Sequence, residues 1–250
     1  MEEGQLDLVL VPLGLVLMGL YHLWLFLTIL RHPKRTVIGL NALTRHRWVK
    51  SMMTDPSKNG VLAVQTIRNS IMASTLLATT SITLTSIIGV VVSYATNSST
   101  SSSLIYGNKT ELTAAIKYFT ILLCFLVAFL CNVQSIRYYA HVSFLVSVSL
   151  PRDAKESVDY VARCLNRGSF FWSLGLRAIY VSFSLFLWIF GPIPMFVCCC
   201  TMSCLLYFLD TTSDFSRQLH VLLGREEEGS KLGREEEGSK LRDAESQQVD

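Results

Sequence analysis

Eight polar or basic side chains lie close to one end of the long apolar segments in this chain. Guanidinium groups form paired hydrogen bonds with phosphate and carboxylate oxygens. If the segments bundle, several of these side chains could converge, and they then predict a binding site for an anion or a lipid phosphate. The alternative is that they are interfacial anchors whose charged ends reach the lipid headgroups. The eight residues are His22, Arg68, Asn69, Asn132, Gln134, Arg137, His141 and Arg177.

The motifs indicate no other chemistry. The segment GREEEGSKL occurs twice, at residues 224–232 and 233–241. It has serine before lysine where a P-loop needs lysine first, and its glutamates would repel phosphate. The sequence contains no nucleophile elbow, no HExxH motif and no carboxylate pair inside an apolar segment. Its seven cysteines include no CxxC pair, and its histidines are not at metal-ligand spacing. We therefore expect no enzymatic activity, no metal and no cofactor.

Composition indicates the class of protein. Half of the residues are apolar and 16% are charged, a balance typical of an integral membrane protein. The net charge of +3 is too small to indicate a nucleic-acid partner. About 20 apolar residues in a helix cross a bilayer, and four segments reach this length. We therefore expect an all-α, four-helix transmembrane bundle, with spans at residues 6–30, 70–95, 113–133 and 178–209.

The placement of charge predicts the orientation of the chain. Residues 31–58 carry seven lysines or arginines and a single acid, Asp55. Because basic loops are retained in the cytosol, we expect this loop there, with the N-terminus outside and, after four spans, the C-terminus outside as well. Anionic headgroups of the cytosolic leaflet are then expected partners. Whether the host is the plasma membrane or an endomembrane stays open.

The second and third helices are expected to extend beyond the bilayer. One should run from about residue 61 to 95. The other should run from 111 to 150 and measure about 60 Å, twice the hydrocarbon thickness. Both would project into the cytosol. Residues 152–167 have acids in their first turn, arginines near their last and Gly168 just after it, which predicts a separate amphipathic helix. We expect it to pack against the projecting ends.

The fourth span contains a break. Gly191, Pro192 and Pro194 cannot all lie in a straight helix, because proline lacks a backbone donor and collides with the preceding turn. We favour a single kinked crossing over residues 178–209, about 48 Å long as a helix. The alternative is a re-entrant hairpin with its tip at residues 191–194, whose arms would each be too short to cross.

The second span also has a face of small residues, which permits close helix packing and would suit a homo-oligomer. The small residues are Ala73, Ser74, Ala78, Ser81, Thr85 and Gly89.

The loop after this span holds two Asn-x-Ser/Thr triplets, at Asn97 and Asn108, which predict glycosylation. Residues 211–250 are polar and charged, and they predict a disordered tail.

Three stretches resemble the multi-pass membrane family filed under domain of unknown function 599, which is common in plants. They are RNSIMASTLLAT at 68–79, QSIRYYAHVSFLV at 134–146 and NRGSFFWSLGLRAIYVSFSLFLWIFGPIPMF at 166–196. The resemblance covers residues 7–218, and the last stretch is its most specific part. It implies a plant-type integral membrane protein with about four spans, and it assigns no site residue.

Two functions follow from these features. The first is a channel or carrier for a small solute or anion, acting as an oligomer, because four spans are few for a monomeric carrier. The alternative is a non-transporting scaffold or regulator that binds anionic lipid or cytosolic partners through its basic surface. The break in the fourth span and the clustered arginines favour the first, since broken helices often line transporter sites.

Overall fold

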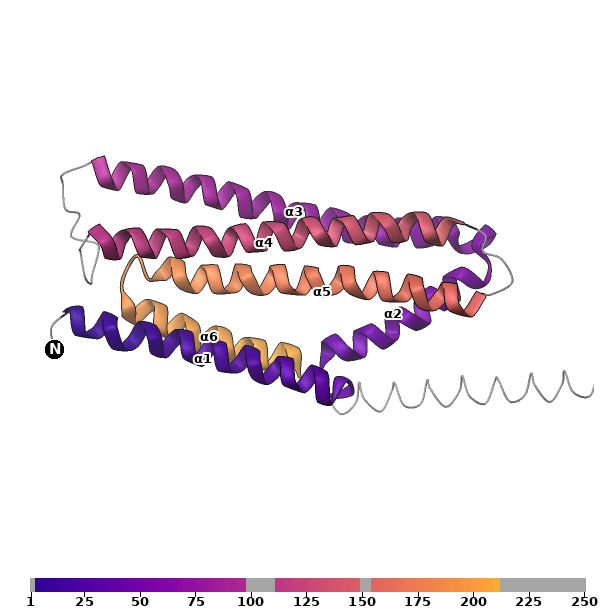
Figure 1. Cartoon of the computed structure of the whole chain (residues 1–250), viewed down its shortest axis with the longest axis horizontal. Coiled ribbons are helices and arrows are strands. Elements are labelled where there is room, and N and C mark those ends of the chain that lie inside the picture. Colours follow the sequence, from indigo (N-terminus) through magenta and orange to yellow (C-terminus); the bar gives the residue numbers. More distant parts are fainter. Residues whose placement is uncertain (1–2, 98–110, 149–153, 212–250) are drawn as a thin grey trace, which may run out of the picture.

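The computed structural model describes residues 3–97, 111–148 and 154–211, and this part of the chain is helical (Figure 1). The expected all-α class is therefore confirmed. The elements are α1 (Glu3–Arg31), the 3-10 turn η1 (Pro33–Arg35), α2 (Val37–Thr54), α3 (Pro56–Asn97), α4 (Glu111–Ser147), α5 (Ala154–Leu187) and α6 (Pro192–Asp210).

Five of these helices are long and apolar enough to cross a membrane, where four were expected. The odd number places the start of α1 and the end of α6 at opposite ends of the bundle, as Figure 1 shows. We call the end where α1 and α6 finish the basic end, because η1 and α2 lie there. The expectation that residue 211 returns to the side of the N-terminus is wrong, and the tail beyond it lies outside the described residues. The candidate spans are Leu6–Arg31, Ser57–Val90, Ala115–Ser147, Lys155–Leu187 and Pro192–Asp210.

The additional span comes from the break after residue 187. The chain makes turns through Trp188 and Phe190, and Gly191 then adopts φ 150°, a conformation that favours glycine. Pro192 occupies the first turn of α6, where its missing N–H is not needed. The chain reverses here, so the single kinked span over 178–209 is wrong. The hairpin alternative had the reversal right, but both of its arms are full-length helices.

The separate amphipathic helix at 152–167 is also wrong, because the described part of this segment, residues 154–167, is continuous with the rest of α5. Gly168 does not end the helix. Instead, a Cβ at this position would come within 3.0–3.2 Å of Tyr139 and Tyr138 on α4, so the glycine permits close contact between two helices. By extending back to Ala154, α5 reaches 34 residues, about 51 Å, which is ample length for a crossing.

Helices α3, α4 and α5 pack as an antiparallel unit with small residues at their contacts. Ser74 and Ser81 on α3 are buried, and the Ser74 and Ser135 hydroxyl oxygens lie 3.3 Å apart across α3 and α4. Ser135 donates to the carbonyl oxygen of Gly168 at 2.9 Å. Such bonds between membrane helices stabilise by about 0.6 kcal/mol each. Three residues of the predicted packing face on α3, Ser74, Ala78 and Ser81, are therefore buried inside the chain, and the homo-oligomer stays a prediction.

Helices α1 and α6 run parallel, side by side, as a second unit (Figure 1). At the end opposite the basic end they join the other helices through a polar contact. Trp188 donates its indole N–H to Asp7 at 3.2 Å, and Lys117 donates to the Trp188 carbonyl oxygen at 3.3 Å. An apolar core next to this contact fills the space between the unit of α1 and α6 and the unit of α3, α4 and α5. Its buried members are Val11, Met18, Ile88, Ile121, Phe125, Leu185, Met195 and Cys199.

The basic segment after α1 was expected to be a loop, but residues 37–54 form the helix α2. Thr36 caps it by accepting a hydrogen bond from the Gly39 N–H at 3.2 Å, and Thr36 also pairs with Thr211 after α6. α3 and α4 continue past the end of α6, as expected for these two long helices, and α5 does so as well (Figure 1). α2 packs on these projecting ends. Their common core is Val49, Ala63, Ile67, Tyr139, Val142, Val146, Val161, Ala162, Cys164 and Leu165.

Candidate anion-binding site

A cavity of about 390 Å³ lies between α2, α3, α4 and α5 near the basic end. Ligand sites for small molecules typically measure 300–1,000 Å³ and combine apolar walls with a few polar groups. This cavity has that composition, with two tryptophans, several hydroxyl groups and one arginine. The residues that line it are Thr44, Arg45, Trp48, Thr66, Ile67, Ser70, Ala73, Tyr139, Leu165, Ser169 and Trp172.

Arg45 supplies the charge of the cavity. Its Nε donates to Oδ1 of Asn166 on α5 at 2.8 Å, and the Asn166 amide donates to the Ala42 carbonyl oxygen at 3.4 Å. These bonds fix the guanidinium against α5, while its terminal nitrogens have no acceptor among the described residues. Burial lowers the pKa of Arg45, yet a guanidinium stays protonated at neutral pH. The cavity wall therefore carries a half-buried positive charge.

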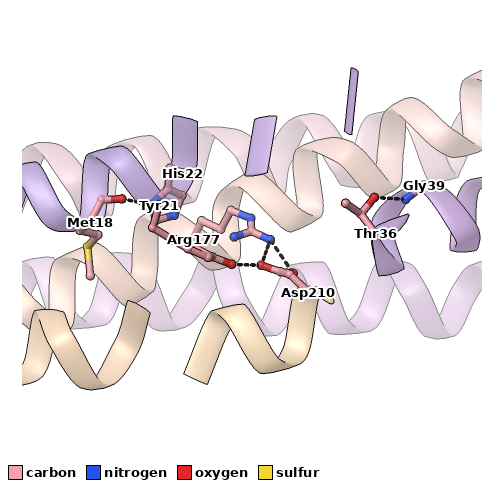
Figure 2. Close-up of polar contacts among 7 residues, drawn as sticks. All are labelled: Met18, Tyr21, His22, Thr36, Gly39, Arg177 and Asp210. Atoms are coloured by element: carbon pink, nitrogen blue, oxygen red, sulfur yellow. Dashed lines mark hydrogen bonds and ion pairs between the residues drawn. The ribbon is translucent and has the colours of Figure 1, made fainter. Parts of the chain in front are cut away.

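A second polar cluster joins α1, α5 and α6, and Figure 2 shows its side chains. Arg177 on α5 donates to both carboxylate oxygens of Asp210, at 2.8 and 2.7 Å, and the Tyr21 hydroxyl donates to the same carboxylate. The side chains of Arg177 and Asp210 are only 13% and 11% exposed. The last residue of α6 is thus tied to both of its neighbouring helices.

Two nitrogen atoms in this cluster are left over. His22 donates from Nδ1 to the Met18 carbonyl oxygen at 2.7 Å, which makes Nε2 an acceptor in the neutral ring (Figure 2). Nε2 of His22 and Nη1 of Arg177 are both buried without a hydrogen-bond partner within the described part of the chain. Nε2 of His22 can accept a hydrogen bond and Nη1 of Arg177 can donate one.

A family model described as "Protein of unknown function, DUF599" matches residues 9–215. The chain belongs to the DUF599 family. The match covers most of α1 and the whole of the bundle after it, and it confirms the resemblance seen in the three stretches. Comparisons with curated proteins and with solved structures find no match.

In this DUF599 protein the eight predicted site residues do not form one cluster. His22 and Arg177 come together around Asp210 (Figure 2). Asn132 is buried at the contact with Gly175, where its amide donates to the Ala128 carbonyl oxygen. The remaining residues do not line the cavity. Gln134 is half-buried, and Arg68, Asn69, Arg137 and His141 are exposed.

None of the residues that line the cavity was predicted as a site residue from the sequence. Arg45 and Trp48 were counted as part of a basic loop, although Thr36 is a good N-cap and no proline interrupts residues 37–54. These two signals could have revealed α2, but not its place against α5. The predicted glycosylation at Asn108 lies outside the described residues. Asn97 is the last residue of α3, and its glycosylation stays a prediction.

Proposed function

We propose that this protein is a multi-pass membrane protein that binds a small organic anion in the cavity between α2 and α5. This corresponds to the non-transporting scaffold or regulator described above, and it involves no catalysis. The observation that carries it is the guanidinium of Arg45, which is half-buried in a largely apolar wall and has no carboxylate partner among the described residues. Removing a charge from water is costly unless an opposite charge offsets it. A bound anion would supply that charge.

Comparison with the other buried cations supports this proposal. Arg177 is paired with Asp210, and the Lys117 amine lies 3.9 Å from an oxygen of Asp7. Each of these cations therefore has its anion within the chain. Arg45 instead has the neutral amide of Asn166, which orients the guanidinium and leaves its charge for a ligand.

We expect Arg45→Gln to weaken the binding of octyl phosphate by about 10- to 100-fold, because a hydrogen bond to a charged group is worth about 1.5–3 kcal/mol. Isothermal titration with the protein in phosphatidylcholine nanodiscs would measure this change. Arg68→Gln is the matched control, since Arg68 is adjacent to the cavity residue Ile67 but is exposed. Equal losses in both variants would assign the effect to general surface charge and overturn the proposal.

Transport is the second candidate, and the cluster within the membrane favours it. Nη1 of Arg177 has no hydrogen-bond partner among the described residues and lies between α1, α5 and α6, where a passing anion would need a hydrogen-bond donor. The apolar core around Phe125 and Met195 fills the opposite half of the bundle. A path through one chain would therefore require that core to open, and a path through an oligomer would require a new helix contact.

Proteoliposome flux separates the two candidates. For a carrier we expect uptake of octyl phosphate by the wild type and loss of uptake in Arg45→Gln. The two proteins differ only at Arg45 in the cavity wall, so the difference in uptake would be assigned to the cavity. If Arg45-dependent binding occurs without flux, the protein is a binding protein and not a carrier. The mass of the protein in mild detergent tests the oligomeric pore, and a strict monomer would count against it.

A further inference from the structure

The position of the cavity relative to the bilayer can be derived from the shortest span. α6 has 19 residues, about 28 Å, which is close to one hydrocarbon thickness. Its two ends therefore mark the two boundaries of the hydrocarbon layer. Trp188, just before α6, lies at one boundary with Lys117, and Asp210 lies at the other. These two polar levels bracket the membrane core.

The cavity lies at the second boundary. Counting about 20 residues back along α5 from Trp188 reaches Gly168, and 20 residues along α4 from Lys117 reaches Arg137. The wall residue Ser169 follows Gly168 directly, and the wall residue Tyr139 is two residues beyond Arg137. The cavity is thus at the level of the lipid headgroups on the basic side, where tryptophan side chains are enriched.

The cavity is also polarised along the membrane normal. The guanidinium of Arg45 is bonded to Asn166, which is on the part of α5 that projects beyond the membrane. Trp172 is six residues further along the same helix, about 9 Å toward the membrane core. Ala73 is the wall residue of α3 nearest to the core. The charged part of the cavity therefore faces the aqueous side, and its apolar part faces the hydrocarbon.

We propose that the ligand is an amphiphilic anion, with a phosphate or carboxylate head on Arg45 and an apolar body between Trp172 and Ala73. This polarity matches a molecule that is already oriented in the leaflet at the basic end, with its head toward water. The inference rests on the binding role proposed above and names the class of ligand. The same chemistry is shared by a lipid that resides in the bilayer and by a free amphiphile that enters from water.

The test uses full-length protein in phosphatidylcholine nanodiscs and a series of inorganic phosphate, butyl phosphate and octyl phosphate. Tryptophan fluorescence, to which Trp48 and Trp172 in the cavity wall contribute, reports binding. The same titration on Arg45→Gln subtracts partition into the bilayer and the response of the two tryptophans outside the cavity. Each buried methylene is expected to raise the Arg45-dependent affinity by about fourfold. Ala73→Phe, which fills the apolar part, is expected to lower the octyl affinity to the butyl level and to leave butyl phosphate unaffected.

Nanodiscs that contain phosphatidic acid distinguish the two sources. If phosphatidic acid displaces octyl phosphate from the wild type, the ligand class is supported and the source is a bilayer lipid. If it does not, while the chain-length dependence holds, the class is supported and the source is a free amphiphile.

The results that would overturn the amphiphilic ligand differ from those that would overturn the anion-binding role itself. Arg45-dependent binding that is the same for inorganic, butyl and octyl phosphate would overturn the amphiphile and leave the anion-binding role intact. No Arg45-dependent binding of any probe would overturn both. The chain-length series needs only the wild type and Arg45→Gln, so it decides the question even if Ala73→Phe does not fold.

Discussion

Asp210→Ala is expected to lower the free energy of unfolding by about 3–5 kcal/mol, because it leaves the Arg177 guanidinium buried without a counter-charge. Arg177 is 13% exposed and directs two hydrogen bonds to the lost carboxylate. Tyr21 loses its acceptor at the same time. Unfolding of the purified protein in mixed micelles, followed by circular dichroism, would measure the change.

Asp159→Ala is the matched control for this prediction. The Asp159 carboxylate and the His46 ring are in contact at 2.7 Å, the same distance as Arg177 and Asp210, but the side chains are 42% and 45% exposed. An exposed pair contributes little to stability, because water and salt screen its charges. If the two variants lose equal stability, burial does not determine the strength of the Asp210 cluster. The double variant Arg177→Met with Asp210→Leu should recover much of the loss, since it leaves no unpaired charge.

Gly39→Ala should destabilise the protein by about 3 kcal/mol, the upper part of the range for overpacking a tight site. A Cβ at residue 39 would lie 2.1 Å from the carbonyl oxygen of Pro33 and 2.7 Å from its carbonyl carbon. Both atoms belong to the backbone, so the junction between η1 and α2 must move as a whole. The Thr36 cap and its pairing with Thr211 lie at this junction.

The control is Gly19→Ala, because a Cβ at Gly19 meets nothing within 4 Å. That change is expected to add about 0.5–1 kcal/mol, the usual gain for alanine over glycine within a helix. Thermal unfolding of both variants tests the pair of expectations. A neutral Gly39→Ala would show that the chain adjusts freely at the start of α2, and the close packing there would then be unimportant for stability.

The membrane class and most helices follow from local features of the sequence. Apolar length alone identifies α1 and the apolar parts of α3 and α4. The length of α4 was also predictable, since no glycine or proline interrupts residues 111–147. These features depend on residues close together in the chain, so the free-energy terms that they report are already present in a single helix.

The number of spans was not decided by apolar length. Residues 178–209 read as one uncharged run, and the segment before them carries charges and a glycine typical of a helix end. In the folded chain Gly168 lies against Tyr139, so α5 continues through it. Gly191 then reverses the chain. Whether a glycine ends a helix or lets another helix approach depends on its neighbours in space, which are far away in sequence.

The candidate site was likewise predictable from the sequence only in part. The residue types for anion binding, and a basic segment to supply them, were evident from composition and charge. Arg45 was among those basic residues, but Arg68 and Arg137 appeared equally suitable. Only the packing of α2 on α5 buries Arg45 beside Asn166 and leaves Arg68 exposed. The sequence by itself determined a helical membrane protein with a basic end, and the tertiary structure decided which of its charges lose water and so can select a ligand.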